Sequence, residues 1–142
     1  MKVSIACDHG AFSFKPALIK CLEENDIQVQ DCGTHSDESC DYPDFAKKAL
    51  DLLVKGEVDR AILTCTNGIG MSIVANKTSG VRAALAYSEK TAETTRRHHD
   101  SNALCLGTDE FSEQQLISFI RVWLKTDFEE GRHLRRINKF PS

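Results

Sequence analysis

Strand and helix patterns alternate along the whole chain, and this alternation restricts the possible fold more than any other feature. Ala61, Ile62 and Leu63 form a continuous apolar run, as in a strand that is buried on both faces. Apolar residues recur at helical spacing before and after it. We therefore predict a three-layer α/β/α sandwich with a five-stranded, parallel, Rossmann-like sheet. The expected strands are 2–7, 27–31, 58–65, 81–87 and 103–106, and the expected helices are about 11–25, 43–55, 71–77, 88–98 and a last one containing Leu116 and Leu124.

The composition fits one folded domain, residues 1–142, in which 129–142 form a basic tail. The chain has 142 residues, of which 41% are hydrophobic and 27% charged. A net charge of −3 gives no basic field for nucleic acid or anionic lipid, so we expect neither as a partner. The N-terminal apolar stretch is too short for a signal peptide, which favours a cytoplasmic protein. The six cysteines lack a C-x-x-C spacing, so we expect free thiols.

The end of the third expected strand carries the strongest functional signal. Cys65 closes this strand, and Thr66-Asn67-Gly68-Ile69-Gly70 leads from it into a helix. Backbone N–H groups of such a turn converge on one spot, and the helix dipole adds positive potential there. The turn could hold an oxyanion or a phosphate, or favour the thiolate form of Cys65 as a base or nucleophile. The alternative is a buried cysteine that packs at the sheet edge.

The glycines of this turn do not match the common nucleotide-binding motifs. Gly70 is followed by Met71 instead of the lysine of a Walker A motif, and a dinucleotide fingerprint would need a third glycine at Ile73. A cysteine phosphatase would need an arginine shortly after Cys65, and none is present there. We therefore expect a small anionic ligand rather than a nucleotide.

Further candidates for acid–base chemistry follow the first strand and end the polar helix. Asp8 and His9 could orient a ligand hydroxyl or move a proton, although Asp8 could instead cap a helix. One of His98 and His99 could point into the strand-end crevice as a general acid or base. The alternative for both histidines is a solvated helix end.

Two arginines in the basic tail could bind a phosphate. Arg132 and Arg136 are four residues apart, so on a helix they share a face. Together they could grip a phosphate through charge-assisted hydrogen bonds, unless the tail is only a solvated helix. A cysteine base, a histidine acid, an anion-binding turn and an arginine pair indicate proton transfer on a phosphorylated small molecule.

The ordered set of motifs resembles the B-type ribose-5-phosphate isomerases, which share a family with the subunits of galactose-6-phosphate isomerase. The resemblance covers essentially the whole chain, and its specificity comes from the order of the motifs rather than from any one of them. The matching stretches are 7–10 (Cys-Asp-His-Gly), 41–43 (Asp-Tyr-Pro), 56–59 (Gly-Glu-Val-Asp), 65–70 with 72–77, 80–83 (Gly-Val-Arg-Ala), 98–102 (His-His-Asp-Ser-Asn) and 131–133 (Gly-Arg-His).

This resemblance implies a role for each matching residue. Cys65 corresponds to the general base that moves a proton between the first two sugar carbons, and His98 to the acid that helps to open the furanose ring. The amides of 66–70 would hold the enediolate oxygens, as an oxyanion hole does. The remaining expected substrate contacts come from Asp8, His9, His99, Arg132 and Arg136. The resemblance implies no metal and no cofactor. It also implies a homodimer or homotetramer with sites shared between subunits, in which the tail packs on a neighbouring subunit.

The chain departs from the family pattern at three places. Thr66 and Asn67 replace the first two residues of the usual Gly-Thr/Ser-Gly-x-Gly turn. His99 replaces the asparagine that usually follows the histidine acid, and Asp109 stands where the family has an arginine. These changes leave Cys65 and His98 intact, so they bear on the identity of the sugar more than on the type of reaction.

The sequence therefore predicts an aldose–ketose isomerase that acts on ribose 5-phosphate. One alternative is the same chemistry on galactose 6-phosphate, allose 6-phosphate or a tetrose phosphate. A second is a non-catalytic partner subunit of a heteromeric isomerase, which the presence of both Cys65 and His98 disfavours. A third is a thiol-dependent redox protein, which the lack of a resolving cysteine near Cys65 disfavours.

Overall fold

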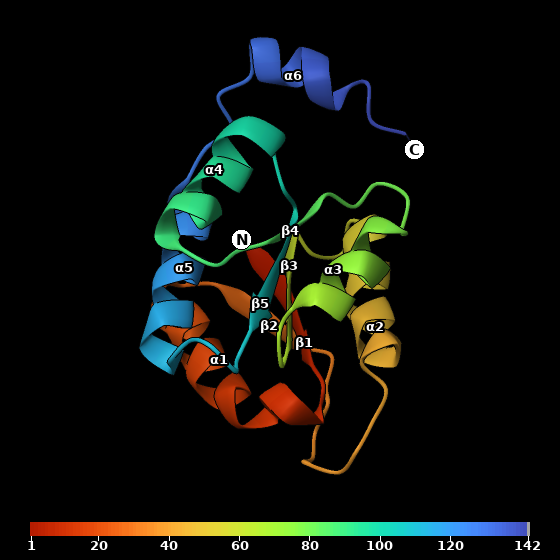
Figure 1. Cartoon of the computed structure of the whole chain (residues 1–142), viewed down its shortest axis with the longest axis vertical. Coiled ribbons are helices and arrows are strands. Elements are labelled where there is room, and N and C mark those ends of the chain that lie inside the picture. Colours follow the sequence, from red (N-terminus) through yellow and green to blue (C-terminus); the bar gives the residue numbers. More distant parts are fainter. Residues whose placement is uncertain (142) are drawn as a thin grey trace.

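The computed structural model describes residues 1–141 and contains a five-stranded sheet whose strand pairs are all parallel (Figure 1). The strand order is β2-β1-β3-β5-β4. The predicted α/β architecture with a five-stranded parallel sheet is confirmed. The strands are β1 (Lys2–Cys7), β2 (Gln28–Asp31), β3 (Arg60–Cys65), β4 (Ala83–Leu85) and β5 (Ala103–Gly107).

Helices cover both faces of this sheet. Figure 1 shows α1, α4 and α5 on one side of it, and α2 and α3 on the other. The short α6 lies beyond the end of α4, at one extreme of the molecule. Within residues 1–141, no helix combines the length and the apolar character needed to cross a membrane. The helices are η1 (His9–Phe14, a 3-10 helix), α1 (Lys15–Glu24), α2 (Tyr42–Val54), α3 (Ile69–Asn76), α4 (Glu89–His99), α5 (Glu113–Lys125) and α6 (Arg132–Ile137).

The two faces of the sheet differ in the size of their side chains. Toward α1 and α5 the sheet presents large residues such as Ile62 and Leu104, which belong to the same core as the fully buried Trp123. Toward α2 and α3 most of its side chains are small, so these helices approach the strands closely. The hydroxyl of Ser4 accordingly donates a hydrogen bond to the Ala49 carbonyl in α2, at 3.1 Å. The small residues on this face are Ala6, Ala61, Ala103 and Cys105.

The fourth strand is shorter than its sequence pattern predicts, because only Ala83–Leu85 of the expected 81–87 joins the ladder. Before the strand, the side-chain oxygen of Asn102 accepts the backbone N–H of Arg82 at 2.7 Å. After it, the Tyr87 N–H donates to a threonine hydroxyl in α4 at 3.1 Å. Side chains thus replace the neighbouring strand as hydrogen-bond partners, and this ends the strand at both sides.

The first helical segment and the tail lie where the sequence predicts them, and the structure adds detail to both. The expected helix 11–25 is η1 followed by α1, and Pro16 stands within the first two positions of α1, where a missing N–H costs no hydrogen bond. The tail that carries Arg132 and Arg136 forms a helix, α6, so these two residues share a face.

Candidate active site

The carboxyl ends of β1 and β3 meet at the point where the strand order reverses. β1 connects outward to β2, which forms one edge of the sheet, whereas β3 leads to β4 and β5 on the other side. Ligands of open α/β sheets bind at such a switch point, beyond the carboxyl ends of the strands. Here Asp8 follows β1 and Cys65 ends β3. The fold therefore brings two of the predicted site residues to the expected edge of the sheet.

Cys65 is buried, and its sulfur is held at the start of α3. The backbone N–H of Gly68 donates a hydrogen bond to Sγ of Cys65, with an N···S distance of 3.1 Å. Gly68 has φ +74°, a left-handed conformation that glycine adopts without strain, and it is the N-terminal cap of α3. The predicted turn and helix are confirmed. The sulfur lies where the amides of a helix N-terminus converge, the environment that suits a negatively charged group.

The start of α2 and the end of β5 both approach the turn 66–70 closely. A Cβ added to Gly70 would lie 2.6 Å from the ring of Tyr42. A Cβ added to Gly107 would lie 2.7 Å from the backbone of Asn67. The turn is therefore fixed from both sides, which keeps its amides and the cysteine sulfur in one arrangement.

A cavity of about 280 Å³ opens beside this turn. Asp109, one of the positions at which the sequence departs from the expected pattern, has an exposed side chain near it. The backbone N–H of Asp109 donates to the Thr66 carbonyl at 2.9 Å, so the residue supports the turn through its main chain. The cavity walls include Thr66, Asn67, Ile69, Tyr87, Glu110 and Phe111.

Asp8 and His9 both make structural contacts next to the switch point. The carboxylate of Asp8 accepts the backbone N–H of Ala11 at 3.1 Å and caps η1, which is the capping role considered for it from the sequence. Nδ1 of His9 accepts the backbone N–H of Cys40 at 3.2 Å and so ties the loop between β2 and α2 to this edge. Their sugar-binding roles remain predictions.

His98 does not reach the strand-end site of its own chain, and this part of the sequence prediction is wrong. A helix that connects parallel strands runs back along them, so α4 ends at the amino edge of the sheet. Asn102, just after α4, accepts the backbone N–H of Ala61 near the start of β3. Cys65 lies four residues further along, about 13 Å at the usual strand rise. Figure 1 shows the end of α4 and α6 at the extreme opposite to η1. The residues at this amino edge include His98, His99, Arg132 and Arg136.

An ion-pair network fixes the end of α4 at this edge. Asp100 ends the helix with φ +45° and accepts hydrogen bonds from Arg82 and Arg96, both at 2.8 Å. Arg96 is buried and also donates to the carbonyl of Ser101 at 2.6 Å. The two histidines that precede Asp100 are thereby presented from a rigid helix end. His99 is exposed, and its ring lies at 76° to that of His98.

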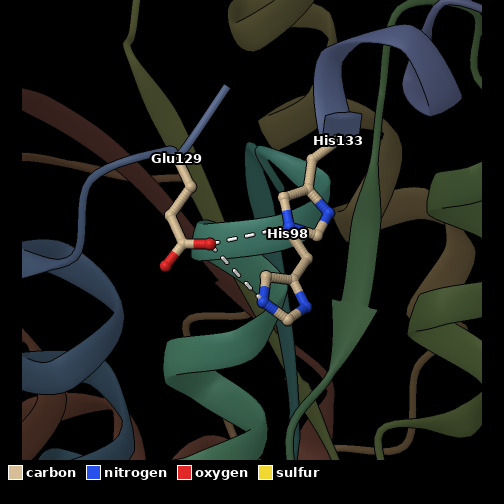
Figure 2. A group of neighbouring side chains, drawn as sticks. All are labelled: His98, Glu129 and His133. Carbon is tan, nitrogen blue, oxygen red and sulfur yellow. Dashed lines mark ion pairs between the residues drawn. The ribbon is translucent and has the colours of Figure 1, made fainter. Parts of the chain in front are cut away.

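Two further residues, Glu129 and His133, gather around His98. Figure 2 shows the Glu129 carboxylate facing both imidazole rings, with Oε2 at 3.7 Å from Nε2 of His98 and 3.5 Å from Nε2 of His133. The two rings stack with their centroids 4.1 Å apart. The sequence analysis missed this group, although the four-residue spacing of Glu129 and His133 on the way into a helix is a usable signal.

This group contains three residues, two imidazoles and a carboxylate, whose possible metal-ligand atoms lie within 4.8 Å of one another. A metal would have to lie near the plane of each imidazole to accept its lone pair. The planes of His98 and His133 are only 7° apart and face each other, so no point lies in both. Glu129 is also paired with Arg97, whose charge opposes a cation. The arrangement thus fits a carboxylate that faces two imidazoles better than it fits a metal centre.

Comparison with known proteins identifies the family. Residues 3–140 match the family described as Ribose/Galactose Isomerase. The chain belongs to this family. Ribose-5-phosphate isomerase B of Escherichia coli is 36% identical over 136 residues, which cover 96% of this chain and 91% of that protein. Several other relatives in the ribose/galactose isomerase family carry only the broader description of sugar phosphate isomerase.

Solved structures of the ribose/galactose isomerase family agree with the fold over nearly the whole chain. Ribose-5-phosphate isomerase B of Clostridium thermocellum superposes with a TM-score of 0.96 at 40% identity, covering 98% of this chain and 94% of that one. The Mycoplasma genitalium enzyme, solved with bound ribulose-5-phosphate, gives 0.93 at 39% identity, covering 97% and 92%. The chain is thus an aldose–ketose isomerase of the ribose-5-phosphate isomerase B type.

Proposed function

We propose that this isomerase interconverts ribose 5-phosphate and ribulose 5-phosphate. The observation that carries the proposal is the position of the Cys65 sulfur at the start of α3, 3.1 Å from the Gly68 amide. A base at this point can face the first two carbons of a sugar while the amides of the turn 66–70 hold its oxygens. The ribulose-5-phosphate bound to the Mycoplasma genitalium relative supports the choice of a pentose.

In the proposed reaction, His98 first protonates the ring oxygen as the bond from that oxygen to C1 breaks, and the O1 hydroxyl loses its proton to solvent. The Cys65 thiolate then takes the proton from C2 of the open-chain aldose. The electrons of that C–H bond form the C1–C2 double bond of an enediolate, with the negative charge on O1. The O2 proton passes to O1, and the Cys65 thiol returns its proton to C1. All proton transfers balance without a redox partner.

The opposite positions of Cys65 and His98 in one chain support a site built from two subunits. We propose that the amino edge of one chain covers the turn 66–70 of its neighbour in a dimer, or in a tetramer built from such dimers. His98, Arg132 and Arg136 of the neighbour would then face the ring and the phosphate of the substrate. A symmetric dimer would contain two such sites.

Exposed apolar surface on both edges supports this assembly. Ile69 and Ile73 lie four residues apart on α3, directly after the Cys65 turn, and are 50% and 54% exposed. At the amino edge a cavity of about 560 Å³ opens between β4 and the tail, with Ile137 and Phe140 in its walls. An unpartnered apolar face beside a catalytic turn is typical of an interface between subunits.

The main alternative is the same reaction on another sugar phosphate. Thr66 and Asn67 are exposed at the turn, and an acidic side chain, Asp109, stands beside it where the family has a basic one. These positions can change which sugar hydroxyls are bound without changing the base. Galactose 6-phosphate, allose 6-phosphate and a tetrose phosphate are the candidates. A non-catalytic partner subunit is the second alternative.

The test is the initial rate of ketose formation by the purified chain in the presence of EDTA, measured in parallel on ribose 5-phosphate, galactose 6-phosphate, allose 6-phosphate and erythrose 4-phosphate. We expect the highest kcat/KM on ribose 5-phosphate and loss of that rate in Cys65→Ala. A higher kcat/KM on another sugar would reassign the substrate. Inactivity on all four sugars, followed by activity after addition of a paralogous chain, would identify a partner subunit.

A further inference from the structure

The chain after α5 turns back along α4 and places one carboxylate beside His98. The backbone N–H of Glu129 donates to the Arg97 carbonyl at 3.0 Å, which anchors this segment to the last turn of α4. Nε of Arg97 donates to Oε1 of Glu129 at 2.7 Å, and its Nη2 also donates to this oxygen. Arg97 therefore occupies Oε1 and leaves Oε2 to face the imidazoles.

The protonation states of Glu129 and His133 are set by the groups around them. The hydrogen bond from Arg97 holds the pKa of Glu129 below its usual range, so the carboxylate is ionised at neutral pH. Burial, together with the charges of His98 and Arg132, lowers the pKa of His133. His133 is only 6% exposed, so a neutral, immobile ring stacks on His98.

His98 is thus bounded on two sides. The carboxylate of Glu129 faces its Nε2, and the ring of His133 covers one of its faces at a centroid distance of 4.1 Å. Figure 2 shows that the second ring nitrogen of His98 is turned away from Glu129. A carboxylate on one imidazole nitrogen orients the ring and balances its positive charge while the other nitrogen faces the substrate.

We propose that Glu129 is a positioning residue for His98, with His133 as the platform that fixes the plane of its ring. This inference rests on the proposed function, because it assigns the opening of the sugar ring to His98. Glu129 supplies the counter-charge for the protonated imidazole and keeps the free nitrogen aimed outward, at the partner's substrate. Neither Glu129 nor His133 takes part in the transfer between C1 and C2.

The experiment compares two partial reactions in Glu129→Gln, which keeps the shape of the side chain and removes its charge. Conversion of ribose 5-phosphate requires ring opening. Exchange of the C1 hydrogen of ribulose 5-phosphate with deuterated solvent requires only the Cys65 base, because this ketose cannot close a furanose ring. We expect conversion to fall at least ~10-fold, with exchange unchanged within about twofold. The matched control is Glu130→Gln, an exposed neighbour, which should alter neither reaction.

A purely structural role of Glu129 predicts a different pattern. If Glu129 only held the tail in place, Glu129→Gln would also displace Arg132 and Arg136, and conversion and exchange would fall together with a higher KM. That result, or full conversion by the variant, would overturn the proposal.

A spectroscopic measurement tests the positioning role of Glu129 without measuring turnover. In ¹H–¹⁵N spectra of the histidine rings, Glu129→Gln should shift the ring-nitrogen signals of His98 and leave those of His9 and His35, on the opposite edge, unchanged. Unchanged His98 signals would refute the positioning role even if the enzyme acted on another sugar. A wild-type chain with the expected spectra but neither conversion nor exchange would instead refute the proposed function alone.

Discussion

The amide nitrogen of Gly68 lies 3.1 Å from Sγ of Cys65, so the residue that caps α3 also fixes the sulfur. We expect Cys65→Ala to lower kcat by about 10²–10⁴-fold, the usual contribution of a positioned base, with little change in ligand affinity. Steady-state rates and calorimetric titration with ribulose 5-phosphate measure the two effects. Cys65→Ser keeps a hydrogen-bond acceptor for the Gly68 amide and controls for local folding. An alanine variant with most of its turnover would show that Cys65 is not the base.

Gly107 allows β5 to approach the turn 66–70 closely. Its added Cβ would lie 2.7 Å from Cα of Asn67, and a backbone atom cannot rotate away as a side chain can. We expect Gly107→Ala to displace the turn 66–70 and to lower kcat/KM by about 10²-fold. Gly56→Ala is the control: it strains a residue at φ +72° but meets no atom within 4 Å, so it should lower the melting temperature without a selective loss of kcat. Equal kcat in both variants would contradict the role of Gly107.

Shared sites predict complementation between two inactive chains. When Cys65→Ala and His98→Asn proteins are unfolded together and refolded as a mixture, half of the dimers are mixed. Each mixed dimer contains one site with both residues intact. The expected activity is about one quarter of wild type. Sites contained in one chain would give no recovery at all, because no mixed dimer would then have an intact site.

Arg136 should act on affinity rather than on chemistry. We expect Arg136→Ala to raise KM for the sugar phosphate about 10- to 100-fold, since a charge-assisted hydrogen bond to a phosphate contributes about 1.5–3 kcal/mol. Arg135→Ala removes the same charge about 100° away around α6 and is the matched control. Comparable KM values for the two variants would show that the rise in KM follows from the lost net charge and not from a specific contact of Arg136 with the phosphate.

The six cysteines are free thiols, as predicted, and should differ in reactivity with pH. Burial raises the pKa of Cys7 to about 11, and of Cys105 further still, so both remain protonated at pH 8. We expect iodoacetamide at pH 8 to label the half-exposed Cys40 first. Because only the thiolate reacts, Cys7 labelling should increase as the pH rises toward 11. Mass spectrometry of labelled peptides measures this order, and early labelling of Cys7 at pH 8 would contradict it.

The sequence was sufficient for the sheet and for the Cys65 turn because both depend on local patterns. A continuous apolar strand, a cysteine at its end and a glycine-containing turn are properties of neighbouring residues. The length of β4 was not predictable in the same way. It depends on the side chain of Asn102, which is distant in sequence and takes the Arg82 amide.

The position of His98 required the path of the whole chain. Its identity as a candidate came from the motif, but the direction of α4 places it at the amino edge, away from Cys65. Glu129 and His133 were missed for a related reason: their contact with His98 exists only because the segment after α5 folds back on Arg97. The residues next to His98 in the sequence indicate neither its location at the amino edge nor its contact with Glu129 and His133.

The small side chains between the sheet and α3 also affect how such an enzyme can diversify. Ala61, Ala103 and Cys105 are fully buried, so we expect larger residues there to overpack the layer that supports α3 and Cys65. On the opposite face, with its large residues around Trp123, hydrophobic substitutions that conserve side-chain volume should affect the site less. We therefore expect new sugar preferences to arise at exposed turn positions such as Thr66 rather than in the buried layer beneath them.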